Sequence, residues 1–266
     1  MTPGVKVILD SISQGVRLTT FEVVCPVHTW THVLTHRALS RNAQSHRAIP
    51  VAKLIEKATY TPTDWGAKGK GMAPTKSIED LSTIHQLTAE WDAARQNAIA
   101  TARRLDGLGL HKELANRVLS PFLYVTALVS ATEWTNFLAL RADVSSGVQG
   151  DTFDVASAIK TSLAIHTPTE RTSHFPFVTG TEWEKHKRGP SLSAARCARV
   201  SYTSHDGEID LDKDLELADT LTANKHYSPF EHVAMSYVEE DVKLNYANYR
   251  APWIQWRHFE HRWSKP

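Results

Sequence analysis

Residues 36–47 carry an unusual density of groups that bind anions. The segment reads His-Arg-Ala-Leu-Ser-Arg-Asn-Ala-Gln-Ser-His-Arg and contains no acidic residue. Cations without a carboxylate partner repel one another unless an anion lies among them, and arginine forks and serine hydroxyls suit phosphate oxygens. A solvated helix end with capping serines is the structural alternative. The composition favours a site for a mononucleotide or for the phosphate of a cofactor.

A second cluster, residues 225–232, reads Lys-His-Tyr-Ser-Pro-Phe-Glu-His. Ser228 and Pro229 have the types expected of a helix cap and a first helical residue. That interpretation leaves His226 and His232 unexplained, although an isolated pair of histidines is more often packed or capped than functional. The cluster therefore indicates a helix start and only weakly a site.

Polar side chains also interrupt a long apolar stretch between residues 112 and 141, and such groups are costly in a helix unless they are paired or exposed. A surface face is the structural alternative to a cleft. If the stretch is helical, Asn136 and Arg141 lie roughly 140° apart around it and border one cleft only from adjacent faces. The polar residues are Glu113, Asn116, Arg117, Glu133, Asn136 and Arg141.

Several classes of protein are disfavoured by what the sequence lacks. It has no Gly-x-Ser-x-Gly elbow, Walker loop, Gly-x-Gly-x-x-Gly fingerprint or His-Glu-x-x-His motif. Cys25 and Cys197 stand far apart, which argues against zinc ribbons and disulfide frameworks, and Cys25 suits buried packing better than nucleophilic attack. A net charge of +1 argues against a protein that binds long nucleic acid. The same charge argues against a binder of single strands that stacks bases on its tryptophans. Without a signal peptide or an apolar span, the chain is expected in the cytoplasm and not in a membrane.

The elements that must position these residues follow from the apolar pattern. Residues 5–10 and 16–25 read as a strand pair that Pro26 ends, and residues 61–76 form a loop rich in Gly, Pro and Lys. Helical spacing is predicted over residues 30–39, 77–105, 112–141 (one helix, or two joined at Pro121) and 155–165. Residues 166–190 are linker-like, and further helical or strand-bearing segments are predicted at 192–202, 211–224 and 231–242. The fold class is α+β.

Together these clusters resemble the flavin-dependent thymidylate synthases. The family signature of Arg-His-Arg, seven residues and Ser-x-Arg corresponds to Thr35-His36-Arg37, seven residues and Ser45-His46-Arg47. Similar family segments are found at residues 20–26, 112–119, 136–143, 195–202 and 226–232. The last two follow the signature here, although they precede it in compact members. This order resembles a longer, circularly permuted subgroup that is common in phages and some bacteria.

The resemblance implies an α+β fold with a central helical bundle, an antiparallel sheet and motifs in permuted order. Residues 1–165 would hold the strand pair, the signature and the central helices. Residues 166–190 would be a linker, and residues 191–266 would complete the same fold with a flavin-site segment. The resemblance also implies a homotetramer whose sites are shared among subunits, so that site residues need not converge within one chain. Permutation is tolerated when chain termini lie close together.

The resemblance further implies FAD as cofactor, with NADPH and methylenetetrahydrofolate as co-substrates, and no covalent protein nucleophile. His36 and Arg37 would contact the flavin with Asn42 and Asn136 nearby, and Ser201, His226 and Glu231 would serve its dinucleotide part. The nucleotide site would comprise Ser45, Arg47 and Arg117 for the phosphate, Arg141 for the pyrimidine and Glu113 beside them. The residues expected to be catalytic are Arg37, Ser45 and Arg141.

Four features depart from the family pattern. Thr35 and Ala43 replace an Arg and a Glu, as they do in the longer subgroup. His32 stands where Gln or Glu is usual, and residues 148–152 degrade an Ala-Gln-x-Glu-Ile run. The last two features leave room for a different substrate or product.

Three hypotheses about function follow from the resemblance. The leading one is C5 methylation of dUMP to dTMP. Flavin-dependent hydroxymethylation of dUMP or dCMP for modified phage DNA is the first alternative, and a non-catalytic nucleotide-binding relative is the second. A phage-encoded protein would work in the host cytoplasm.

Overall fold

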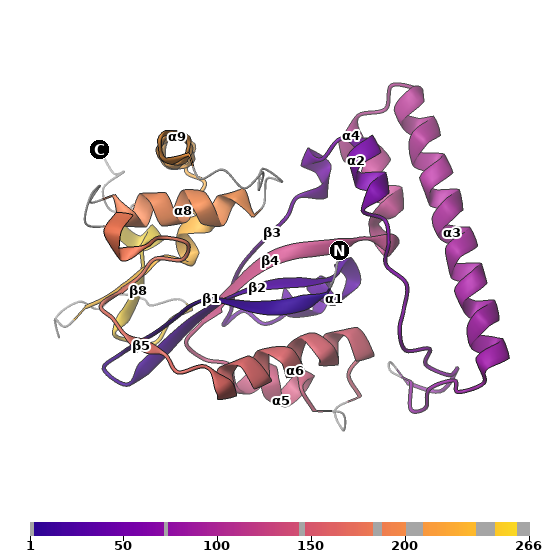
Figure 1. Cartoon of the computed structure of the whole chain (residues 1–266), viewed down its shortest axis with the longest axis horizontal. Coiled ribbons are helices and arrows are strands. Elements are labelled where there is room, and N and C mark those ends of the chain that lie inside the picture. The colour runs from indigo at the N-terminus through magenta and orange to yellow at the C-terminus, as the bar shows by residue number, and fades with distance from the viewer. Residues whose placement is uncertain are drawn as a thin grey trace.

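A computed structural model describes residues 3–71, 74–143, 147–182, 188–200, 210–237 and 248–259. A five-stranded sheet in the order β3-β4-β2-β1-β5 forms its centre (Figure 1). The strands β1 to β4 pair antiparallel, and β5 runs parallel to β1. The strands are β1 (Gly4–Ser13), β2 (Val16–Pro26), β3 (Ser40–Ala43), β4 (Tyr124–Ala131) and β5 (Thr169–Glu170). The fold is α+β, as the sequence predicts.

The hairpin β1–β2 confirms the predicted strand pair. Its turn residues Gln14 and Gly15 have φ angles of 48° and 75°. Two positive φ angles are what a two-residue hairpin turn of primed type requires, because only that twist matches the flanking strands. β2 reaches Pro26, as predicted, and Val27 N just beyond it still donates to the carbonyl of Leu123 at 3.0 Å.

The helix predicted over residues 112–141 is wrong. In its place the chain forms α4 (Lys112–Ala115), the 3-10 helix η2 (Asn116–Phe122), the strand β4 and α5 (Thr135–Arg141). β4 lies between β2 and β3 and is covered on both faces, so apolar side chains such as Val129 and Leu128 occupy both faces. A short apolar run of this kind does not distinguish a buried strand from a buried helix by its periodicity.

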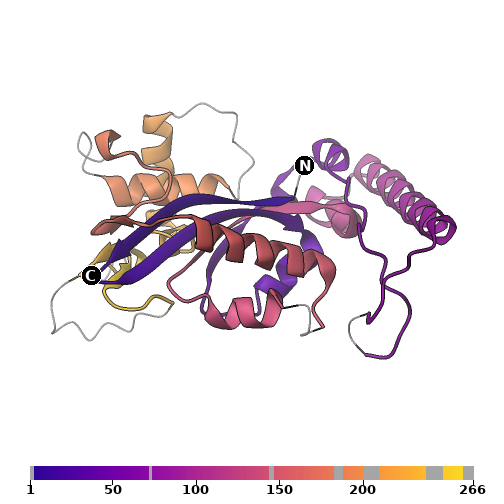
Figure 2. The same ribbon diagram turned by 60° about the horizontal axis from the view of Figure 1, so that its bottom comes forward.

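One face of the sheet packs against three helices and holds the largest core cluster. Phe21 and Val23 of β2 and Val129 of β4 point to this face, where they meet Trp30 and Phe137. The covering helices are α1 (Val27–Val33), α5 and α6 (Gly150–Ile165), and Figure 2 shows α5 and α6 beneath the sheet. α1 begins and ends earlier than the helix predicted for residues 30–39, and α6 contains the one predicted for 155–165.

The C-terminal third of the chain covers the opposite face (Figure 2). A second sheet has the order β6-β7-β8, and Cys197 of α8 packs on Leu128 of β4. Residues 166–190, expected as a linker, contribute β5 and β6 to the two sheets. Of the predicted segment 231–242, residues 238–242 lie outside the described residues. The elements here are β6 (Ser173–His174), α8 (Gly189–Arg199), α9 (Leu211–Ala223), the 3-10 helix η4 (Pro229–Glu231), β7 (Ala234–Ser236) and β8 (Trp253–Gln255).

Two buried histidines join the two sheets through hydroxyl groups. His174 contacts Ser11 Oγ through Nδ1 at 2.9 Å and Thr20 Oγ1 through Nε2 at 2.8 Å. Thr20 continues to Ser130 Oγ at 2.6 Å, and Ser130 to His232 Nδ1 at 2.8 Å. Since both histidines are fully buried, burial lowers the pKa of each to about 3. They are therefore neutral packing groups, the interpretation that the sequence favoured for His232.

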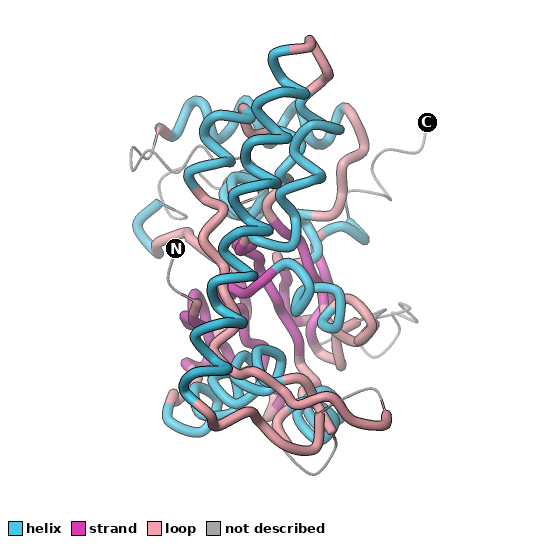
Figure 3. Tube along the Cα trace, turned by 90° about the vertical axis from the view of Figure 1, so that its right-hand side faces the viewer, coloured by secondary structure: helices cyan, strands magenta, loops and turns pink. Residues whose placement is uncertain are grey.

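The long helix α3 (Leu81–Gly107) runs along one end of the molecule (Figure 3). Asp80 caps it by accepting a hydrogen bond from Thr83 N at 2.8 Å, and Gly109 follows its end with a φ of 81°. The predicted apolar stripe faces the core at Trp91, Ala98, Ala102 and Leu105 but leaves Ala94 exposed. This stripe packs on α2 (Val51–Glu56) and η2. No described helix combines the length and apolarity that crossing a bilayer requires.

Candidate functional site

The signature segment, residues 36–47, is extended and does not form a compact cluster. His36 and Arg37 lie in turns after α1, Ser40–Ala43 form β3, and His46–Ala48 form the 3-10 helix η1. The four residues of β3 alone separate the two ends of the segment by about 10 Å. The cations therefore lie in different surroundings, and no single anion has to lie among all of them.

Arg41 has a structural role that the sequence did not reveal. Its Nη1 donates hydrogen bonds to the carbonyl oxygens of Leu34 at 2.9 Å and His36 at 2.8 Å. These carbonyls follow the end of α1, where helix termini leave acceptors unpaired. Arg41 thereby fixes the turn that presents His36 and Arg37.

Four predicted site residues line one cavity of about 270 Å³: His36, Arg37, Asn136 and Arg141. They come from the turn after α1 and from α5, about a hundred residues apart in the sequence. Asn136 and Arg141 border this cavity together, as the sequence allowed, and Phe137 between them forms part of its wall.

A direct hydrogen bond joins the two halves of this cavity. Arg141 Nε donates to His36 Nε2 at 3.1 Å. Burial lowers the pKa of His36, and the charges of Arg141 and Arg41 lower it further. A hydrogen bond with Asn136 has the opposite effect but does not outweigh them. His36 is thus neutral at pH 7, and because Nε2 accepts, the ring proton resides on Nδ1. The neutral imidazole fixes the orientation of a guanidinium group at the cavity wall.

Asn42 and His226 share a second cavity of about 390 Å³ with Lys225 and Tyr227. Asn42 Nδ2 donates to the carbonyl of Cys197 at 2.9 Å, which ties β3 to α8. Pro229 begins a helical turn as predicted, but that turn is 3-10, and the Ser228 side chain makes no capping hydrogen bond. Ser201, predicted beside His226, lies outside the described residues.

Glu231 lies near this region but does not line the cavity. Its carboxylate pairs with Arg257, and its carbonyl oxygen accepts hydrogen bonds from Tyr249 Oη at 2.7 Å and Gln255 Nε2 at 2.9 Å. Burial raises the pKa of Glu231, although Arg257 and Arg41 oppose that shift. Glu231 therefore anchors β8 through Gln255, and its charge acts on Arg41.

The remaining predicted residues gather around η1. Asn116 Nδ2 donates to the carbonyls of His46 and Ile49, both at 2.9 Å. The first residue of η2 therefore fixes η1, the C-terminal end of the signature segment. Arg47 is exposed, and Arg117 pairs with Glu113 at 3.5 Å on the surface. Ser45 precedes η1 and is half-buried. Lys112 Nζ donates to the carbonyl of Ala48 at 2.9 Å, which adds a second hold on η1.

Two departures from the family pattern contact each other. Thr152 Oγ1 lies 3.2 Å from His32 Nδ1, between α6 and α1. Burial lowers the pKa of His32, with smaller contributions from the charges of Arg141 and His28. The charge of Arg141 therefore acts on His32, the side chain that Thr152 contacts.

The described residues contain no group of three or more His, Cys, Asp or Glu side chains placed to hold a metal ion. They do not bring the predicted site into one place either. The residues divide into a His36–Arg141 cavity, an Asn42–His226 cavity and the η1 surface around Arg47 and Arg117.

Comparison with known proteins gives one family. A family model described as thymidylate synthase complementing protein matches residues 17–169. No curated protein sequence matches the chain. Two similar solved structures are those of a UMP/dUMP methylase PolB from Streptomyces cacaoi, bound with 5-Br dUMP and with 5-Br UMP. They are 24% and 23% identical to this chain, with TM-scores of 0.48 and 0.46. Each match covers 56% of this chain, and the two matches cover 67% and 68% of the PolB chains.

Proposed function

The chain belongs to the thymidylate synthase complementing protein family, and we propose that it transfers a one-carbon unit to C5 of a deoxypyrimidine monophosphate. In the leading form of this proposal it methylates dUMP to dTMP with FAD, NADPH and methylenetetrahydrofolate. The observation that carries the proposal is the cavity where His36 and Arg37 meet Asn136 and Arg141. Its donors suit a flat ring system that carries carbonyl oxygens.

The chemistry of this donor set fits a flavin. Two guanidinium groups, an amide, a neutral imidazole and the carboxylate of Glu133 line the cavity, and Phe137 supplies an apolar wall. His36, Arg37 and Asn136 would hold the isoalloxazine ring, and Asn42, His226 and Ser201 would serve the dinucleotide part. When bound in its reduced form, the flavin supplies hydride equivalents.

The protein's own part in the reaction is orientation and charge. Arg141 would polarise a pyrimidine carbonyl, and the hydrogen bond to His36 holds its guanidinium in a fixed direction. Arg37 would add a second positive charge at the same cavity. Ser45, Arg47 and Arg117 would bind the nucleotide phosphate, with Glu113 orienting Arg117 by their ion pair.

The cysteines support a reaction without a protein thiolate. Cys25 and Cys197 are the only two in the chain, and both are fully buried. Burial raises the pKa of Cys25 to about 12 and that of Cys197 above its ordinary value as well. A nucleophilic thiol needs the opposite shift and an exposed sulfur. Neither cysteine can therefore add to the pyrimidine ring.

The separation of the three residue groups supports a shared site. We propose a homotetramer in which the η1 surface of one copy, with Arg47 and Arg117, faces the His36–Arg141 cavity of another. Leu140 lines that cavity and is 47% exposed, and a second copy would cover it.

A hydroxymethylase is the second candidate, favoured by the contact between His32 and Thr152 beside Arg141. Two hydrogen-bonding side chains at this place give the protein a means to hold water near the base. Such a water would quench the one-carbon adduct and leave a hydroxymethyl group.

Incubation with dUMP or dCMP, methylenetetrahydrofolate and NADPH, followed by mass analysis, separates the candidates. A methylated nucleotide supports the leading form, and a hydroxymethylated one replaces it with the second. A purified protein without flavin absorbance that leaves both nucleotides unchanged would overturn both in favour of a non-catalytic nucleotide-binding protein.

A further inference from the structure

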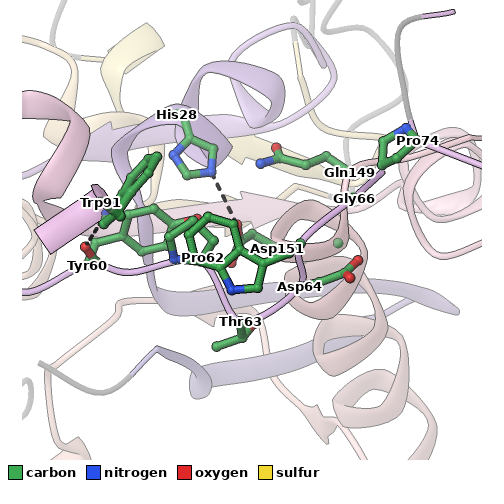
Figure 4. A pocket seen from close by; sticks show the side chains of 12 residues that line it. His28, Tyr60, Pro62, Thr63, Asp64, Gly66, Pro74, Trp91, Gln149 and Asp151 are labelled. Carbon is green, nitrogen blue, oxygen red and sulfur yellow. Dashed lines mark hydrogen bonds and ion pairs between the residues drawn. The ribbon is translucent and has the colours of Figure 1, made fainter. Parts of the chain in front are cut away.

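A third cavity of about 370 Å³ contains none of the site residues discussed so far. It lies between the loop after α2, the helix α3 and the start of α6 (Figure 4). Part of its wall is formed by Gln149, Gly150 and Asp151, which belong to the segment that departs from the family pattern. Its volume falls within the range of small-molecule sites.

Asp151 is the charged centre of this cavity. Its Oδ2 accepts a hydrogen bond from Tyr60 Oη at 2.7 Å and lies 3.2 Å from His28 Nε2, as Figure 4 shows for the histidine. Burial raises the pKa of Asp151, but the hydrogen bonds from His28 and Tyr60 outweigh it, so the pKa falls below its ordinary value. Both bonds use the same oxygen. Among the described side chains no donor reaches Oδ1, which leaves that oxygen available to a ligand.

Further carboxylates make the cavity negative. Asp64 lines it, and Asp154 lies one turn along α6 from Asp151. Burial raises the pKa of Asp154, and the charges of Asp151 and Asp64 raise it further, so the three carboxylates share one electrostatic field. The lining residues include no lysine or arginine, and His28 is their only titratable base.

The other walls are aromatic and firmly held. The ring centroid of Trp91 lies 5.9 Å from that of Tyr60 and 6.2 Å from that of Trp65. Trp91 Nε1 donates to the carbonyl of Tyr60 at 3.0 Å, and Ile78 N donates to the carbonyl of Trp65 at 2.7 Å. Electron-rich ring faces beside carboxylates attract organic cations.

A glycine closes this wall. A Cβ on Gly66 would approach Pro74 Cγ to 2.3 Å, so the two sides of the loop can meet only because residue 66 has no side chain. The backbone bridge between Gly66 and Ser77 and the hydrogen bond from Ala67 N to the carbonyl of Lys76 keep them together. The cavity is therefore formed before any ligand arrives.

We propose that this cavity binds a small organic ammonium ion, a primary amine cation on a flat or aliphatic stem. The ammonium group donates to Asp151 Oδ1 within the field of Asp64, and the stem lies against Trp65 and Trp91. This assignment is independent of the proposed C5 chemistry, because none of the residues it uses lines the His36–Arg141 cavity.

Calorimetric titration with 2-phenylethylammonium, and separately with the neutral analogue 2-phenylethanol, tests the proposal on the full chain. The cation should bind at least tenfold more tightly than the alcohol. Asp151→Asn keeps an acceptor for Tyr60 and removes the charge, so it should weaken cation binding about tenfold. Glu90→Gln is the matched control, since Glu90 is exposed and adjoins Trp91 in sequence without lining the cavity. Its affinity should equal that of the unmodified protein.

Equal binding of cation and alcohol, or unchanged affinity in Asp151→Asn, overturns the proposal. If Asp151→Asn fails to fold, Asp64→Asn replaces it, because Asp64 is exposed and makes no structural hydrogen bond among those described. This variant should weaken cation binding several-fold, and an unchanged affinity would again reject the site. C5 activity is measured in parallel on each variant, so that a loss of cation binding is distinguished from a loss of the proposed C5 chemistry.

Discussion

Acidification from pH 7 to pH 5 should destabilise this protein, because His174 and His232 are buried as neutral rings. Their folded pKa of about 3 lies below the ordinary value of 6.5. The unfolded chain therefore binds more protons than the folded one between these pH values. The stability contributed by the neutral rings is complete above pH 6.5 and is lost as pH falls toward 3.

The magnitude follows from the shift. Each pH unit below 6.5 costs about 1.4 kcal/mol for each histidine, so the loss at pH 5 is about 2 kcal/mol each and about 4 kcal/mol for both. That is a large share of the 5–15 kcal/mol that stabilises a typical domain. A protonated His232 would also bury an N–H at Nε2, for which no acceptor exists among the described groups.

Urea unfolding followed by tryptophan fluorescence at pH 7, 6 and 5 measures this dependence. His232→Asn is the informative variant, because its side-chain amide can replace Nδ1 as the partner of Ser130 Oγ but does not titrate. It should lose about 2 kcal/mol less than the unmodified protein between pH 7 and pH 5. The lowered pKa values of His32, His36 and His46 act in the same direction in both proteins. Equal unfolding free energies at pH 7 and pH 5 in the unmodified protein would refute the reasoning.

Three further predictions follow from the site and its supports. Arg47→Ala should weaken dUMP binding about tenfold or more, since a charged hydrogen bond is worth about 1.5–3 kcal/mol; calorimetry checks this against Arg103→Ala on the exposed side of α3, and equal affinity in both would exclude Arg47 from the phosphate site. His226→Ala should release flavin during gel filtration, and full flavin absorbance afterwards would contradict its role at the Asn42 cavity. Asp80→Ala should lower the melting temperature by removing the cap of α3, with C5 activity retained; an unchanged melting temperature would show that the cap contributes nothing.

The sequence predicted those parts of the fold in which local chemistry decides the structure. The hairpin β1–β2 follows from β-branched runs around a turn, and α3 from its stripe and its terminal glycines. The prediction failed at β4, because a strand that is buried on both faces lacks the alternation of apolar and polar residues that identifies a strand. The error also changed the site, since Asn136 and Arg141 belong to the short helix after this strand and not to one long helix.

The contacts that make the site were beyond the sequence. Nothing in the spacing of His36 and Arg141 indicates that they share a hydrogen bond, because the folding of the whole sheet brings them together. Arg41 reads as a candidate anion ligand, yet it binds backbone carbonyls. The cavity around Asp151 was missed because its residues come from four separate segments, and the only signal was the unusual composition of residues 148–152.

Release of tritium from C5 of labelled dUMP and dCMP tests the central claim most directly, because either proposed product requires that the C5 hydrogen leave. With methylenetetrahydrofolate, NADPH and FAD present, the protein should release tritium from at least one nucleotide. Arg141→Gln should release it about a hundredfold more slowly, as expected when one donor to a developing negative charge is removed. No release from either nucleotide, or an equal rate in the variant, would contradict the assignment of C5 chemistry to the His36–Arg141 cavity.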